Sequence, residues 1–106
     1  MGTTLGDRYA ELLTAQETTT SKTVATGRRN SVGVLLKLTG TGAVTATVKV
    51  SGGFDGSNFV EVVSFEMSGT TSVLEGAVED WPWSWLKLEL TAITGTGAAL
   101  TAQVSG

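Results

Sequence analysis

The sequence contains neither cysteine nor histidine, and these two absences exclude a large part of protein chemistry. Without cysteine the chain can form no disulfide and no thiolate metal site. Without histidine it lacks the commonest general base and a common metal ligand, and a Ser-His-Asp triad is excluded. We therefore expect a protein that packs and binds, not an enzyme, with no cofactor and no bound metal.

Charge and long apolar runs are also scarce. Charged residues make up 16% of the chain, and the formal net charge is −3. An acidic balance argues against nucleic acid as a partner. No stretch approaches the roughly 20 apolar residues that a membrane span needs, so we expect no membrane partner. The first residues, Met1-Gly2-Thr3-Thr4, lack the basic and apolar regions of a signal peptide.

Threonine, glycine and valine are the commonest of the 106 residues, serine is also frequent, and proline occurs once. Threonine and valine favour strands, and glycine favours tight turns. A chain of this length forms one domain. The composition is typical of short strands joined by turns, as in a sandwich or barrel.

The same arrangement of residues occurs twice. Leu36-Lys37-Leu38 runs into Thr39-Gly40-Thr41-Gly42, and an alternating strand follows over 43–51. Later, the alternating stretch 83–92 runs into Thr94–Gly97, and another strand follows over 98–105. We interpret both Thr-Gly-Thr-Gly segments as hairpin turns between separate strands. Further strands are expected over 22–26, 31–39, 58–67 and 71–74, with a turn at Gly69. Residues 22–106 are thus predicted to form an all-β, antiparallel, jelly-roll-like sandwich of seven or eight strands.

Alternation also predicts which side chains face the core. Residues of one parity in each strand are apolar, and side chains of one parity share a face of a sheet. Leu88 is therefore expected inside and Glu89 outside. The predicted core residues are Val32, Val34, Leu36, Leu38, Val44, Ala46, Val48, Val50, Leu86, Leu88, Leu90, Leu100, Ala102 and Val104.

Residues 1–21 differ from the rest and are predicted to be an N-terminal arm and linker. Their apolar residues have helical spacing and would form a short helix capped by Asp7: Leu5, Tyr9, Leu12 and Leu13. An isolated helix of this length is marginal in water. The segment is either a frayed terminus or, as we favour, an arm whose apolar residues dock on a neighbouring subunit.

Three tryptophans, Trp81, Trp83 and Trp85, share the parity of Lys87 and Glu89. In an extended chain they lie opposite the leucine face, so at least two should lie outside the core. Such a row is an interface with a protein partner or a stacking platform for sugars. The alternative is that Trp81 folds under the loops and the N-terminal arm covers one of the others.

Three further segments carry weaker signals. Asp55-Gly56-Ser57-Asn58 with Glu61 has oxygen ligands for calcium, but ordinary turn chemistry explains it better. Arg28-Arg29 could bind phosphate, but a solvated turn or a contact to acidic residues is favoured. Glu79 and Asp80 are unsuited to paired carboxylate catalysis, because adjacent residues in a strand point to opposite faces.

The order of the motifs resembles a family of small virion structural proteins of tailed bacteriophages. Its members read DGxxWxxV and then WxYLRLxxTAxxGTGA near their C-termini. Here the matching stretches are 55–62, 83–88 and 90–98, and the resemblance extends over residues 22–106. Phe59 stands where tryptophan is usual, and Trp85 and Lys87 stand where tyrosine and arginine are usual. These departures keep the physical type of each residue.

The resemblance implies a phage capsid decoration (cement) protein that binds the head lattice and stabilises it. Its partners would be the major capsid protein or other virion proteins and further copies of itself, in a homo-oligomer. Its location would be the virion, assembled in the host cytoplasm. The alternatives are a head–tail joining, tail or fibre component, and a carbohydrate-binding β-sandwich module, because the Asp-Gly hairpin also resembles discoidin-like and carbohydrate-binding sandwiches.

Overall fold

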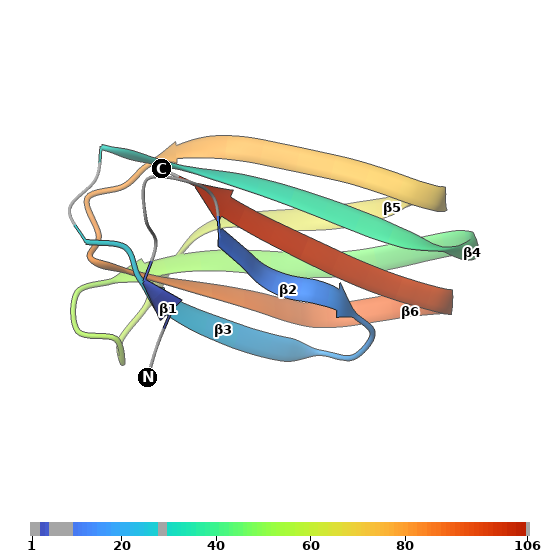
Figure 1. Ribbon diagram of the computed structural model, residues 1–106, viewed down its shortest axis with the longest axis horizontal. Coiled ribbons are helices and arrows are strands. Elements are labelled where there is room, and N and C mark those ends of the chain that lie inside the picture. Colours follow the sequence, from blue (N-terminus) through green and yellow to red (C-terminus); the bar gives the residue numbers. More distant parts are fainter. Residues whose placement is uncertain (1–2, 5–9, 28–29, 106) are drawn as a thin grey trace.

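Three long strands form the centre of the computed structural model, which describes residues 3–4, 10–27 and 30–105 (Figure 1). They are β4 (Ser31–Gly53), β5 (Val60–Asp80) and β6 (Trp85–Ser105). The shorter strands are β1 (Thr3–Thr4), β2 (Ala10–Gln16) and β3 (Thr20–Ala25). The described residues contain no helix. The protein is therefore all-β, and all pairings except the short parallel one of β1 with β3 are antiparallel.

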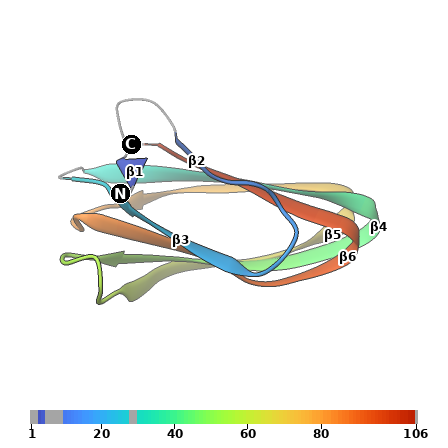
Figure 2. The same cartoon turned by 60° about the horizontal axis from the view of Figure 1, so that its bottom comes forward.

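Each long strand bends midway, so that the sheet folds over on itself (Figure 2). β4 pairs with β5 and β6 on both sides of the bend, and its register to both strands shifts near Thr39–Ala43. Four residues with positive φ lie in or beside these bends: Gly42 of β4, Thr71 of β5, and Gly95 and Gly97 of β6. Glycine adopts such φ values freely, which is why the Thr-Gly-Thr-Gly segments lie here.

The strand order is β1-β3-β6-β4-β5, with β2 also paired to β6. β3 pairs with the first half of β6, from Leu90 to Trp85, and β2 pairs with the second half, from Val104 to Leu100. Together β2 and β3 thus follow β6 around the bend. At the opposite side of the sheet, β5 pairs only with β4 among the described residues.

The core lies between the two halves of the folded sheet. Side-chain parity is kept through each bend: even-numbered residues face inward in β4 and β6 on both sides. All fourteen residues that alternation places inside are buried, with exposed fractions of 0–4%. Val24, Met67 and Trp81 complete the centre. The prediction of the inward face is confirmed.

The expected number of strands is wrong. The described residues form five strands of six residues or more, not seven or eight, together with the two-residue β1. The segments over 39–42 and 94–97, like Gly69, do not reverse the chain at hairpins but lie within continuous strands. The strand before each segment and the strand after it pair with the same neighbours instead of with each other, which makes each segment a bend.

The helix expected near the N-terminus is also wrong where the structure describes it. Ala10–Gln16 is the strand β2, and Leu12 and Leu13 are buried in the chain's own core. These two leucines therefore have little free surface to offer a neighbouring subunit. Leu5, Asp7 and Tyr9 lie outside the described residues. The expected boundary at residue 22 falls inside β3.

Candidate functional site

Trp81 serves the fold itself. Its side chain is 1% exposed, and its Nε1–H donates a hydrogen bond to Thr26 Oγ1 at 3.1 Å. Its backbone N–H donates to the Asn30 carbonyl. A buried indole needs such a partner for its N–H. The three indoles do not form one row, because residues 81–84 are not in a strand. Trp81 is buried, as the alternative interpretation expects, whereas Trp83 and Trp85 are only half-buried.

Trp83 is half-buried and lies against Gly52 of β4. A Cβ at position 52 would sit 2.3 Å from the indole, so the ring occupies the space that only glycine leaves free. Phe54 packs on the other part of the ring, with centroids 5.1 Å apart and planes tilted by 40°. Phe54 itself is 67% exposed. The pair forms an apolar surface that is partly accessible to solvent.

Trp85 begins β6 and points to the outer face of the sheet. Leu86 and Leu88 on the opposite face are completely buried, as alternation predicts. Trp85 is half-buried and approaches Gly56, where a Cβ would lie 3.2 Å from the ring. Farther along this face, Lys87 lies over the Phe59 ring, 5.8 Å from its centroid.

The loop between β4 and β5 is held by Asp55. Its Oδ1 accepts hydrogen bonds from the Ser57 and Asn58 backbone N–H groups, both at 2.9 Å, and its Oδ2 accepts one from Asn58 Nδ2. These bonds, the Asn58 backbone bond first, lower the pKa of the Asp55 carboxyl to about 2. Both carboxylate oxygens thus serve the turn. No group of three or more acidic residues suited to a metal occurs among the described residues.

Phe54, Trp83 and Trp85 together form what we call the aromatic end. The 54–59 loop and residues 81–84 lie at one end of the elongated molecule, and the strand bends lie at the other (Figure 1). Partly exposed rings on glycine-supported positions can bury apolar area against a partner or stack on a sugar. Trp83 and Trp85 as interface residues remain a prediction.

A second surface lies on the outer face of the half-sheet made by the first half of β4 and the second halves of β5 and β6. Leu35, Leu74 and Val78 are 43%, 62% and 74% exposed there. A shallow groove lies beside Leu35 and Val78, and its lining also includes Gly33, Gly76, Gln103 and Ser105. We call this surface the apolar groove. None of the candidates proposed from the sequence includes it.

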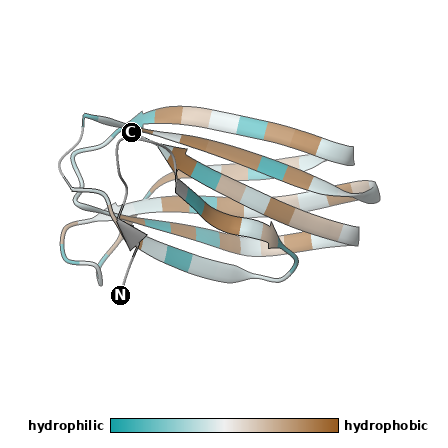
Figure 3. Ribbon diagram, viewed as in Figure 1, coloured by the Kyte–Doolittle hydropathy of each residue, from teal (hydrophilic) through white to brown (hydrophobic). Residues whose placement is uncertain are grey.

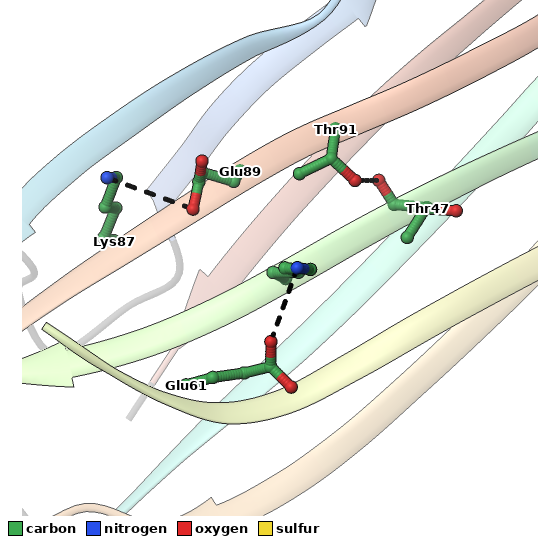
Figure 4. Close-up of polar contacts among 6 residues, drawn as sticks. Thr47, Glu61, Lys87, Glu89 and Thr91 are labelled. Carbon is green, nitrogen blue, oxygen red and sulfur yellow. Dashed lines mark hydrogen bonds and ion pairs between the residues drawn. The ribbon is translucent and has the colours of Figure 1, made fainter.

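Away from Trp85 and Phe59, the outer face of the other half-sheet is polar. Lys49 pairs with Glu61 at 3.7 Å, and Lys87 pairs with Glu89 at 3.9 Å (Figure 4). The Thr91 hydroxyl donates to the Thr47 carbonyl, as Figure 4 also shows. Thr45 and Thr94 share a hydrogen bond farther along the strands. Exposed pairs of this kind contribute little stability, so this face is ordinary solvated surface.

Two of the remaining sequence candidates are Arg28-Arg29 and the adjacent pair Glu79 and Asp80. Arg28 and Arg29 lie outside the described residues. Glu79 is paired in register with Val32, and Asp80 with Ser31, so the two carboxylates leave opposite faces of β5. A signal for the apolar groove was present in the sequence: in Val34-Leu35-Leu36, Val73-Leu74 and Ala77-Val78, one of two adjacent apolar residues must point away from the core.

No helix in the described part of the chain has the length and apolar character needed to cross a membrane. Comparison of the chain with protein-family models and with curated proteins found no match.

Proposed function

We propose that the chain is a virion structural protein of a tailed bacteriophage, and specifically a capsid decoration (cement) protein that binds the head lattice. The sequence resemblance over residues 22–106 supports the phage assignment. The aromatic end supports attachment to a protein surface, and the exposed Phe54 beside Trp83 is the observation that carries the proposal. In this proposal the two halves of the folded sheet act as the two sheets of a jelly-roll-like sandwich.

The proposed mechanism is additive burial without chemistry. Apolar area removed from water contributes roughly 25 cal/mol per Å². Aromatic anchors at the centre of an interface contribute about 2 kcal/mol or more each. Many copies on one lattice, in contact with the major capsid protein and with one another, would strengthen each contact through avidity. The protein would act in the virion, after assembly in the host cytoplasm.

The test uses particles of the phage whose genome encodes the chain, stripped of this protein. We expect the protein to co-sediment with them and the Trp85→Ala and Phe54→Ala variants to bind at least about tenfold more weakly. Thr45→Ala, on the polar face, is the matched control and should bind normally. Normal binding by both aromatic variants would show that the aromatic end is not the surface that attaches to the particle. Electron microscopy of labelled particles distinguishes a head position from a neck, tail or fibre position.

A carbohydrate-binding module is the second candidate, favoured by the same tilted pair of Phe54 and Trp83. Neighbouring aromatic faces of this kind can stack on sugar rings. A glycan array with the purified protein tests it, together with tryptophan fluorescence. A soluble glycan that moves the emission to shorter wavelength, and does not do so in Trp83→Ala, would favour this candidate over the lattice protein.

A further inference from the structure

β5 is an edge strand of the sheet that the described residues form. β5 is 21 residues long and pairs, among the described residues, only with β4. β5 lies at the edge of the sheet (Figure 1), and hydrophilic segments alternate with hydrophobic segments along it (Figure 3). Such a strand presents unpaired backbone N–H and C=O groups to another strand. Proteins commonly protect edges of this length, so the side chains of β5 decide what can pair with it.

Those side chains carry a strong excess of negative charge. β5 contains five acidic residues and no basic one: Glu61, Glu66, Glu75, Glu79 and Asp80. The whole chain has 7 basic and 10 acidic residues, so the rest of the chain has 7 − 5 = +2 while β5 alone has −5. Half of the acidic residues of the protein therefore lie on one open edge.

Two of these carboxylates stand in unusual positions. Glu75 is paired in register with Leu36, and Glu79 with Val32, and both partners are completely buried. The two glutamates thus occupy the core-facing side of the edge strand. Neither forms an ion pair with a residue that the structure describes. Both glutamates lie on the edge strand, where an added strand would pair.

The opposite side of the same segment is apolar. Leu74 and Val78 are the two most exposed apolar residues of β5, and Leu35 and the glycine-lined apolar groove continue the surface onto β4. A strand that pairs with residues 72–80 would place alternate side chains beside Leu74 and Val78, and the others beside Glu75 and Glu79. The edge therefore selects alternation of apolar and basic residues.

A second copy of β5 does not meet this requirement, because its own charges are all negative. Inward-pointing charges on an edge strand are a known means of preventing such self-pairing. We propose that residues 72–80 of β5 bind an extended, basic segment of a partner protein, which adds to the sheet as a further strand. Backbone bonds supply affinity in this mode, and side-chain alternation supplies specificity. The proposal concerns a surface other than the aromatic end and does not depend on the virion assignment.

The probe is an acetylated and amidated nine-residue peptide of alternating lysine and valine, titrated into the full chain at low salt. We expect slowed hydrogen exchange at β5 amides in 72–80 and binding that weakens with salt. The Glu75→Gln/Glu79→Gln variant should bind roughly fivefold more weakly, because the ion pairs it removes are exposed and each contributes little. Glu11→Gln/Glu17→Gln, with the same change of charge elsewhere, is the matched control and should bind as the unmodified chain does.

Two further experiments distinguish binding by strand addition from binding by charge attraction alone. A peptide of the same composition with its lysines grouped at one end should protect no β5 amide. The Glu75→Lys/Glu79→Lys variant should prefer a glutamate–valine peptide. Equal binding of the grouped and alternating peptides, or of the Gln variant and the unmodified chain, would overturn the proposal. So would protection of β5 amides that rises with protein concentration alone, since the occupant would then be a second copy.

Discussion

β4 and β5 are neighbours of nearly equal length, yet their sequences obey different rules. In β4 every inward residue from Val32 to Val50 is apolar apart from glycines at the bend, and all the apolar ones are buried. In the second half of β5 the inward positions include Glu75 and Glu79, while Leu74 and Val78 face solvent. In a strand with partners on both sides, the core determines which side chains are present. In an edge strand, the side chains are determined equally by the partner that may pair with the free side and by the self-pairing that must be prevented there.

The contrast is sharpest for one residue type at two places. Leu88→Ala, in the central strand β6, should lower the free energy of unfolding by about 2–5 kcal/mol, because the completely buried side chain would leave a cavity. Leu74→Ala, on β5, should change it by less than about 0.5 kcal/mol, because that leucine is 62% exposed. Urea melts of both variants, with Glu89→Ala as a surface control on β6, measure this difference. Equal losses in the two leucine variants would show that β5 contributes to the core as the central strands do.

Gly52 tests how tightly the central strand is packed. A Cβ there would meet the Trp83 ring at 2.3 Å, so we expect Gly52→Ala to destabilise by about 1–3 kcal/mol and to shift tryptophan emission. Gly33→Ala is the control on the same strand, since its Cβ would meet nothing closer than Ser105 Oγ at 3.4 Å. It should melt close to the unmodified protein. A normal melt and emission spectrum for Gly52→Ala would mean that Trp83 does not rest on β4.

Two substitutions at the bends should change the stability of the protein in opposite directions. Thr71 of β5 has φ +63°, a strained value for a β-branched residue, whereas Gly42 of β4 has φ +83° and open space for a Cβ. Thr71→Asn should stabilise by about 1 kcal/mol, since asparagine tolerates this region. Gly42→Ala should destabilise by about 1 kcal/mol through backbone strain alone. Thermal melts of both variants measure these changes. A lower melting temperature for Thr71→Asn would show that Thr71 is not strained.

The loop that joins the two strands should add a small acid dependence. The pKa of Asp55 is lowered from 3.8 to about 2 in the folded state. The ionised carboxylate therefore stabilises the folded protein above pH 4, and this stabilisation is lost as the pH falls toward 2. In Asp55→Ala this part of the loss of stability at low pH should be absent. NMR titration of the carboxyl and melts between pH 5 and 2 check this. A midpoint near 4 for Asp55 would show that the loop hydrogen bonds do not hold the carboxylate.

The inward face was predictable because alternation is a local property that the core enforces. The bends were not, because Gly40 and Gly42 suit a hairpin and a bent strand equally well. What distinguishes the two is pairing with β5 and β6, which lie far away in the sequence. One hint was available: Leu38 and Val44 keep the same parity across the segment, as a continuous strand requires.

The error at the N-terminus has a different physical cause. Leu12 and Leu13 are adjacent and both buried, which a regular strand does not allow and a helix does. In β2 the register to β6 shifts on both sides of Leu13, and Ala15 has φ +46°. These irregularities turn both leucines toward the core. Periodicity alone cannot anticipate such bulges. For the candidate site, the sequence indicated the outward position of Trp85 and offered the burial of Trp81 under the loops only as an alternative, because the bond of Trp81 to Thr26 joins residues far apart in the sequence.

The pairing of β2 and β3 with β6 has a consequence for synthesis on the ribosome. The first strands to emerge have, among the described residues, only the last strand and the two-residue β1 as neighbours in the sheet. β4 and β5 can form their hairpin as soon as residue 80 leaves the exit tunnel. β2 and β3 must wait for residues 85–105, with Leu12, Leu13 and Val24 uncovered in the meantime. Translation pauses between residues 25 and 85 would therefore prolong an aggregation-prone nascent state, and a fast completion of the final strand would shorten it.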